Sequence, residues 1–192
     1  MTTATLAARR PVTETIALLA AFAGAVSVRV AIAGQAGAAS IRAGLVFAAL
    51  LTGVAVVSRV GVSVDARAVG LGLAGVAVLV LPVVVTHDLG AARPGGSFAT
   101  WGIATTVVAT AEEAFLRGAL YDAVQRVRGV DAAVVVGAIA FAALHVPLYG
   151  WRAVPLDFAV GLVLGALRVI AGTWTAPAVA HVGADLIGWW LL

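Results

Sequence analysis

The sequence predicts an all-α, polytopic membrane protein, a bundle of about seven transmembrane helices. Three observations support this fold class. Hydrophobic residues make up 62% of the 192 residues and charged residues only 11%, whereas soluble domains carry about 25% charged residues. The mean hydropathy is +1.10. Apolar runs of roughly 18–23 residues recur between charged residues or Gly and Pro breaks, and a run of that length can span a bilayer as a helix.

The seven expected spans are bounded by these breaks. They cover residues 15–34, 41–60, 67–85, 98–118, 132–149, 155–171 and 174–192. The first run follows Arg9 and Arg10, and its length favours a retained helix over a cleaved signal peptide. The fourth is expected to continue as a polar helix to Arg128 and to turn at Gly129.

The connection from Asp88 to Ser97 contains Pro94, Gly95 and Gly96, which predicts a loop. His87 and Asp88 are expected to be solvated there. Gly161 and Gly165 are four residues apart, a spacing that lets two helix backbones approach closely. We expect such glycines to serve packing within one bundle.

The charges indicate topology signals rather than a nucleic-acid surface. All 12 basic residues are Arg, scattered singly or in pairs near the ends of apolar runs, and their asymmetry predicts a cytoplasmic N-terminus. Arg29 and Arg168 lie near span ends and are expected to reach the lipid headgroups. The absence of Cys excludes disulfides, a thiol nucleophile and cysteine metal ligands. We therefore expect a multi-pass protein of the cell membrane, with membrane lipid and no nucleic acid as partners.

The spans leave no room for a soluble module, so the sequence predicts a single transmembrane domain over residues 1–192. Within it, residues 1–97 form variable N-terminal helices without motifs. Residues 98–192 form the core that carries the hydrophilic motifs described next. Ionisable residues inside apolar spans cost roughly 2.5–3.5 kcal/mol each even on mild insertion scales. Several of them in three spans therefore indicate a functional polar centre.

The first motif is the segment from Glu112 to Gly118 in the fourth span. Glu113 and Arg117 are four residues apart with the acid first, the favoured orientation for an ion pair on a helix. That pairing would relieve the burial of both charges. Glu112 has no obvious partner on its own helix, and a buried carboxylate without a partner is a candidate general acid or base.

The second motif ends in His145, four residues after Phe141 in the fifth span. Glu113 lies sixteen residues before Gly129 and His145 lies sixteen residues after it. If the chain turns at Gly129, two antiparallel helices bring these positions to the same depth. The spacing therefore predicts that the glutamates and His145 face one another.

The third motif is His181 and Asp185 in the last span. The two residues are four apart and so share one face of a helix. A depth of roughly 10–17 Å follows from the rise per residue, which is shallower than His145 by several ångströms. Asp185 could simply orient His181.

These three motifs, EExxxR, FxxxH and HxxxD in that order, resemble the CPBP family over about residues 101–192. This is the CAAX-protease and bacteriocin-processing group of intramembrane endopeptidases, also called the Abi family. The resemblance implies that Glu112 activates a water molecule with help from His145. It also implies that Glu113 and Arg117 support the geometry, and that His181 and the fourth-motif residue stabilise the oxyanion.

Many members of that family have Asn at the position of Asp185. Asp donates a hydrogen bond only when protonated, so fixing the His181 tautomer or binding a metal suits Asp185 better. Two mechanisms stay open. A glutamate and a histidine could activate water without metal. Alternatively, Glu112, His145 and His181 could hold a divalent ion such as zinc with one open position.

The expected function is hydrolysis of a peptide bond in a membrane-associated or lipidated peptide or protein. Two other classes remain as alternatives. One is a non-catalytic membrane immunity or binding protein. The other is a subunit of a proton-coupled transporter, in which buried Glu and His residues form a relay. Inverted repeats or paired broken helices would favour the transporter, and the sequence contains neither.

Overall fold

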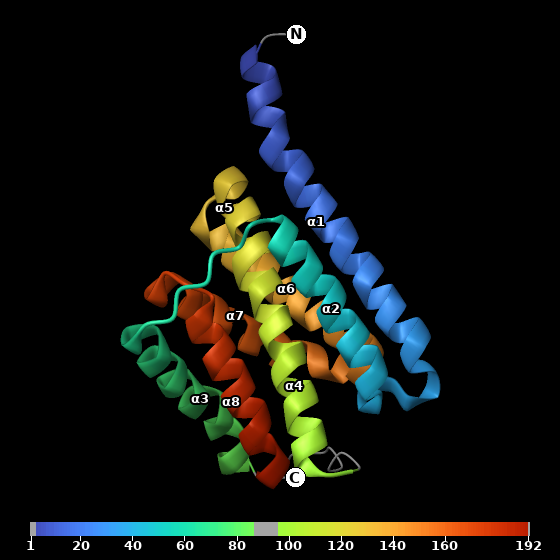
Figure 1. Cartoon of the computed structure of the whole chain (residues 1–192). Helices are drawn as coiled ribbons and strands as arrows, with labels where there is room; N and C mark the ends of the chain where they lie inside the picture. Colours follow the sequence, from blue (N-terminus) through green and yellow to red (C-terminus); the bar gives the residue numbers. More distant parts are fainter. Residues whose placement is uncertain (1–2, 87–95, 192) are drawn as a thin grey trace.

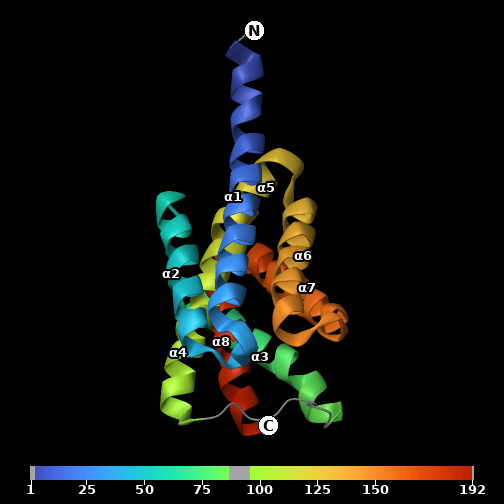
Figure 2. The same cartoon turned by 90° about the vertical axis from the view of Figure 1, so that its right-hand side faces the viewer.

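The computed structural model describes residues 3–86 and 96–191, and within them it consists of helices and short connections (Figures 1 and 2). His87 and Asp88 lie outside the described residues. The elements are α1 (Thr3–Ala33), η1 (Gly34–Ala39), α2 (Ile41–Val57), α3 (Ala66–Thr86), α4 (Phe98–Glu113), η2 (Ala114–Leu120), α5 (Tyr121–Arg128), α6 (Val130–Tyr149), η3 (Trp151–Ala153), α7 (Val154–Ala171) and α8 (Thr175–Leu191).

The described parts of the chain contain seven helical units if α4, η2 and α5 are counted as one continuous helix, which confirms the predicted fold class. The bounds agree with the expected spans except for α1, which starts about three turns earlier. Three stretches are long and apolar enough to cross a membrane: Pro11–Ala39, Val130–Tyr149 and Trp151–Ala171. Ile41–Val57 and Ala66–Leu81 are shorter apolar helices. The composition of these helices is that of a membrane protein.

The helices form one bundle in which several neighbouring helices are not consecutive in the sequence. α1 and α2 pack as a hairpin, and α2 also packs on α4. α8 lies against α3, α4 and α7, while α7 packs along α6 (Figures 1 and 2). Gly129 has φ +85°, which lets the chain end α5 and reverse at once into α6. The predicted turn at Gly129 is therefore confirmed.

Small residues bring α6 and α7 together, as predicted from the glycine spacing. A Cβ atom on Gly161 would lie 2.7 Å from the Cα atom of Ala138, and one on Gly165 would lie 2.8 Å from a methyl group of Val134. Both glycines thus face the interior of this bundle. The division of the chain at residues 97 and 98 stays a prediction.

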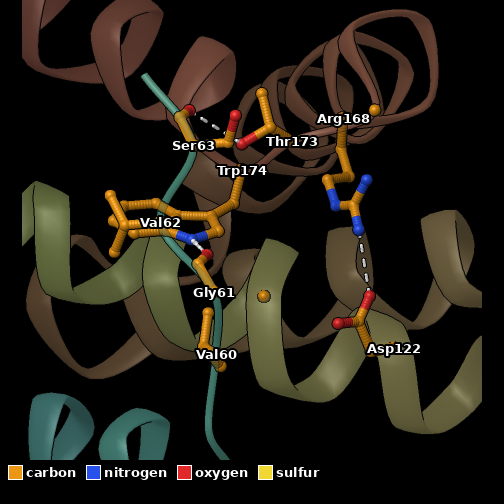
Figure 3. A pocket seen from close by; sticks show the side chains of 10 residues that line it. Val60, Gly61, Val62, Ser63, Asp122, Arg168, Thr173 and Trp174 are labelled. Carbon is orange, nitrogen blue, oxygen red and sulfur yellow. Dashed lines mark hydrogen bonds and ion pairs between the residues drawn. The ribbon is translucent and has the colours of Figure 1, made fainter.

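Hydrogen bonds to the start of α8 hold the connection between α2 and α3 across one end of the bundle. The indole N–H of Trp174 donates to the Gly61 carbonyl oxygen at 2.8 Å, and the Thr175 hydroxyl donates to the Ser63 carbonyl oxygen at 2.6 Å. A cavity of about 280 Å³ lies beside this connection, bordered on its far side by Asp122 and Arg168 (Figure 3).

Arg168 does not reach toward headgroups, so that prediction is wrong. Its guanidinium donates to the Asp122 carboxylate at 3.0 Å and to the Arg117 carbonyl oxygen at 2.8 Å. It also lies over the Tyr121 ring, 4.6 Å from the ring centre. Arg168 therefore joins α7 to η2 and α5.

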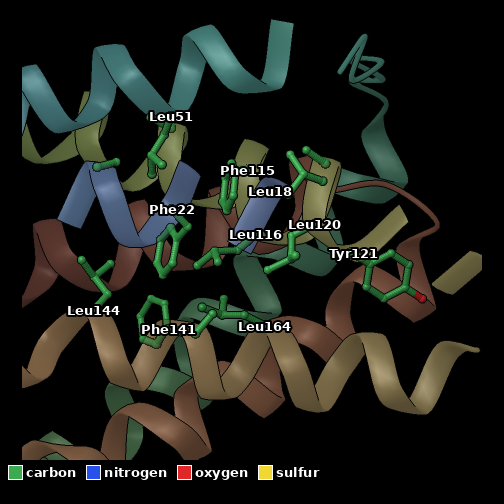
Figure 4. Packing of buried hydrophobic residues seen from close by; sticks show 14 of the residues in the cluster. Leu18, Phe22, Leu51, Phe115, Leu116, Leu120, Tyr121, Phe141, Leu144 and Leu164 are labelled. Carbon is green, nitrogen blue, oxygen red and sulfur yellow. The ribbon is translucent and has the colours of Figure 1, made fainter. Parts of the chain in front are cut away.

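The apolar core lies between α1, α2, η2 and α6 (Figure 4). Phe115 of η2 is fully buried and stacks on Phe22 of α1, with ring centres 5.3 Å apart. Phe141 of α6 and Leu164 of α7 complete the core on the other side of η2. This packing fixes η2, the segment that follows the two glutamates.

Candidate active site

The helix that carries the two glutamates changes its geometry immediately after them. η2, residues Ala114–Leu120, is a π-helix and contains Arg117. π-helical turns are rare and occur frequently at functional sites. The Arg117 carbonyl oxygen receives its hydrogen bond from the side chain of Arg168. A side chain of α7 thus supplies a hydrogen-bond donor to one backbone carbonyl oxygen of the π-helix.

Glu113 is the centre of a buried ionic network. Its side chain is fully buried, and its Oε1 atom accepts hydrogen bonds from Arg117 Nη1 at 2.8 Å and from His181 Nδ1 at 2.9 Å. The predicted ion pair of Glu113 and Arg117 is confirmed. Arg117 also donates to the Gly161 carbonyl oxygen at 3.1 Å. The network therefore joins η2 to α7 and α8 as well as to α4.

Glu112 has a partner that the sequence did not suggest. Arg29 of α1 donates from Nη1 to Glu112 Oε1 at 3.2 Å, and the two side chains are 10% and 4% exposed. Arg29 therefore does not reach the headgroups, and Glu112 is not a carboxylate without a partner. The headgroup prediction for Arg29 was wrong, and Glu112, which has no partner on its own helix, has one on another helix. The sequence did not suggest this pair because its residues are 83 positions apart.

His145 lies near this network without a hydrogen bond to either glutamate. Its Nδ1 atom donates to the Phe141 carbonyl oxygen at 2.9 Å, one turn earlier in α6. The Phe141 ring contacts the His145 ring at 4.6 Å and the His181 ring at 5.3 Å between centres. Because Nδ1 holds the proton of that bond, Nε2 of a neutral His145 carries the free lone pair.

The expected register of the antiparallel pair is confirmed by a neighbouring contact. Arg117 lies over the Phe141 ring at 5.0 Å. These two residues are each twelve positions from Gly129, just as Glu113 and His145 are each sixteen positions from it. The spacing thus predicted the pairing of the helices, whereas the direct contact between acids and His145 is not made.

His181 lies between two carboxylates. Nδ1 bonds to Glu113, and Nε2 lies 3.6 Å from Asp185 Oδ2. The Asp185 side chain is 37% exposed, whereas that of His181 is 9% exposed. In its protonated form, His181 would direct an N–H toward each carboxylate. Glu113 rather than Asp185 makes the shorter contact with the ring.

Two charged residues near this cluster were missed in the sequence. Asp157 of α7 lies 3.9 Å from His145 Nδ1, and its buried Oδ2 atom has no hydrogen-bond partner. The other is Arg29, which continues the buried stripe of Leu18, Phe22 and Ala25 on α1. The exposed faces of α1 also carry large apolar residues, such as Ile16 and Leu19, so no sequence signal distinguishes the face that bears Arg29.

Two of the residues expected to bind zinc each have one donor atom engaged by a protein partner. Glu112 Oε1 accepts from Arg29, and His181 Nδ1 bonds to Glu113. No three His, Asp or Glu side chains among the described residues are grouped to hold a metal ion.

The comparisons with known proteins agree with the geometry of the motifs. A family model described as type II CAAX prenyl endopeptidase Rce1-like matches residues 94–187. These residues include all three motifs and exclude α1, α2 and α3. No curated protein and no solved structure matches the chain. Over residues 94–187, just under half of the chain, the protein is therefore similar to the CPBP family of CAAX-type intramembrane endopeptidases.

Proposed function

We propose that this protein hydrolyses a peptide bond in a membrane-associated or lipidated peptide or protein, in the cell membrane, at the cluster of Glu112, Glu113, Arg117, His145, His181 and Asp185. The observation that carries the proposal is the buried network around Glu113, which ties Arg117 and His181 together inside an apolar bundle. Burying these charges is costly, and a purely structural bundle could avoid that cost with apolar residues.

The proposed chemistry assigns proton transfer to Glu112 and His145. Glu112 holds Arg29 through Oε1, which leaves Oε2 for a water molecule. His145 holds Phe141 through Nδ1, which leaves Nε2 as a second acceptor. Glu112 takes a proton from the water molecule as the water oxygen adds to the carbonyl carbon of the substrate. The C–N bond then breaks, and the departing amine takes that proton from Glu112.

The remaining residues of the cluster would support the charge that develops in this step. An N–H group of His181 would stabilise the oxyanion, and Glu113 would fix the ring through Nδ1. Arg117 would hold Glu113 in place. Asp185, with its oxygen 3.6 Å from Nε2, would favour the N–H form at that nitrogen.

We propose the metal-free mechanism, with the zinc mechanism as the alternative. Its support is that Glu112 and His181 are already engaged by protein partners at 3.2 Å and 2.9 Å. Chelation should then leave the rate unchanged. Loss of activity on chelation, restored by zinc, would instead support metal catalysis.

The test is a cleavage assay of the purified protein in lipid nanodiscs. The substrates are a prenylated CAAX peptide and the same peptide with an acyl chain on its cysteine, each with a fluorophore and quencher around the scissile bond. We expect the wild type to cleave at least one of them, and both Glu112→Gln and His145→Ala to lose about 10²–10⁴-fold in rate. Folding is checked by thermal unfolding.

Two results would refute the proposal. One is no turnover of either peptide by the wild type. The other is wild-type turnover by both variants. A transporter subunit would show proton flux that Glu112→Gln abolishes, and a binding protein would keep its function in both variants.

A further inference from the structure

Arg29 belongs to a part of the chain that neither the motifs nor the family match includes. It lies on α1, whereas the match begins at residue 94. Its side chain is buried and contacts Glu112 across 83 residues of sequence. A buried arginine in a membrane helix costs free energy, and such residues are usually paired and functional.

We propose that Arg29 is a positioning residue of the active site, which holds the Glu112 carboxylate by Oε1 so that Oε2 faces the reacting water. This inference rests on the proposed function, because it assigns Arg29 a role in the reaction of Glu112. It extends the site from the matched region to the first helix of the protein.

The geometry around Arg29 supports a fixed orientation of its side chain. Nη1 lies 3.2 Å from Glu112 Oε1. The guanidinium carbon lies 4.8 Å from the centre of the Phe47 ring on α2, so an aromatic face supports the cation. Phe47 is fully buried and contacts Phe22 of α1 at 6.4 Å between ring centres. The cation is thus held from two helices.

The pairing of charges in the cluster also supports a positioning role for Arg29. Arg117 is engaged by Glu113 at 2.8 Å, so each of the two adjacent glutamates has an arginine of its own. Both of those ion pairs use a single carboxylate oxygen, Oε1. Glu113 shares its Oε1 with His181, whereas Glu112 bonds only to Arg29 among the described residues. Without Arg29, no hydrogen bond in the described residues would fix the Glu112 carboxylate.

α1 does not need a buried arginine to be attached to the bundle. α1 already packs through the apolar residues Leu18, Phe22 and Ala25, which share the buried stripe with Arg29. Glu14 of α1 also forms an ion pair with Arg126 of α5 at 2.8 Å, at an exposed position. The helix therefore has other attachments to the bundle, and the buried arginine is directed at the carboxylate.

The test compares Arg29→Met and Arg29→Lys with a packing control, Leu18→Ala. All three are made in the full chain and assayed in nanodiscs with the peptide that the wild type cleaves. Leu18→Ala weakens the packing of α1 in the apolar core and leaves the charges intact. The kcat and KM values are measured separately, and thermal unfolding is recorded for each variant.

We expect Arg29→Met to lower kcat by about 10–100-fold with KM within about twofold, because a misplaced general base loses part of its 10²–10⁴-fold contribution. Arg29→Lys, which keeps the cation, should recover most of the loss. Leu18→Ala should lower the unfolding temperature and leave kcat within about twofold. If Arg29→Met does not fold, Arg29→Gln replaces it with the same expected loss, because it also removes the charge.

Three results would overturn the inference: wild-type kcat in Arg29→Met, failure of Arg29→Lys to recover activity, or an equal loss of kcat in Leu18→Ala. These results differ from a failure of the proposed function. In that case the wild type does not cleave, or Glu112→Gln cleaves as well as the wild type. An active, Glu112-dependent enzyme that is indifferent to Arg29 would remove only the role of Arg29.

Discussion

Replacement of Arg117 by Met should destabilise the protein far more than an ordinary loss of an ion pair. Arg117 and Glu113 are 2% and 0% exposed, with Nη1 and Oε1 2.8 Å apart. Removing one partner of a buried pair leaves an uncompensated charge and costs about 3–5 kcal/mol. At roughly 2–4 °C per kcal/mol for a chain of this size, the unfolding temperature should fall by roughly 6–20 °C.

A second ion pair of the same length provides the control. Arg126 and Glu14 also have their closest atoms 2.8 Å apart, but their side chains are 50% and 45% exposed. Exposed pairs contribute about 0–1 kcal/mol, so Arg126→Met should change the unfolding temperature by less than about 4 °C. Both variants are followed by thermal unfolding in the same detergent, with tryptophan fluorescence as the signal.

The double variant Arg117→Met/Glu113→Gln separates the charge from the packing. It removes the uncompensated carboxylate, and a neutral replacement of a buried pair is often close to neutral in stability. We therefore expect it to regain part of the loss. Equal destabilisation by Arg117→Met and Arg126→Met, or a double variant less stable than Arg117→Met, would refute the reasoning that burial sets the magnitude.

Two further predictions concern α7. Gly161→Ala should lower the free energy of unfolding by about 1–3 kcal/mol, because the new Cβ atom would lie 2.7 Å from the Cα atom of Ala138. Gly24→Ala, with nothing within 4 Å, serves as the control in the same denaturation experiment and should cause no loss. Asp157→Asn should lower kcat at least about fivefold while stability is kept. A negative charge 3.9 Å from His145 Nδ1 favours a proton on that ring by roughly 1–4 kcal/mol, and an unchanged kcat would contradict this.

Local relationships in the sequence predicted a large part of the site. The ion pair of Glu113 and Arg117 follows from their spacing on one helix turn. The register of α6 against the preceding helix follows from the turn at Gly129, as the contact of Arg117 with Phe141 confirms. In both cases the geometry of a single helix or a single hairpin is sufficient. The π-helical form of η2 and the bond that Arg168 donates to it were not predicted, since that bond joins residues 51 positions apart.

Sequence alone thus determined the helices, their ends apart from the start of α1, and the membrane character of this chain, because length, apolarity and breaks act locally. Only the tertiary structure decided which helices are neighbours, and with it the pairing of Arg29 with Glu112 and of Asp157 with His145. The physical reason is that lipid is as apolar as the interior of the bundle. The inward and outward faces of such helices therefore differ little in composition, and the sequence does not reveal which faces meet.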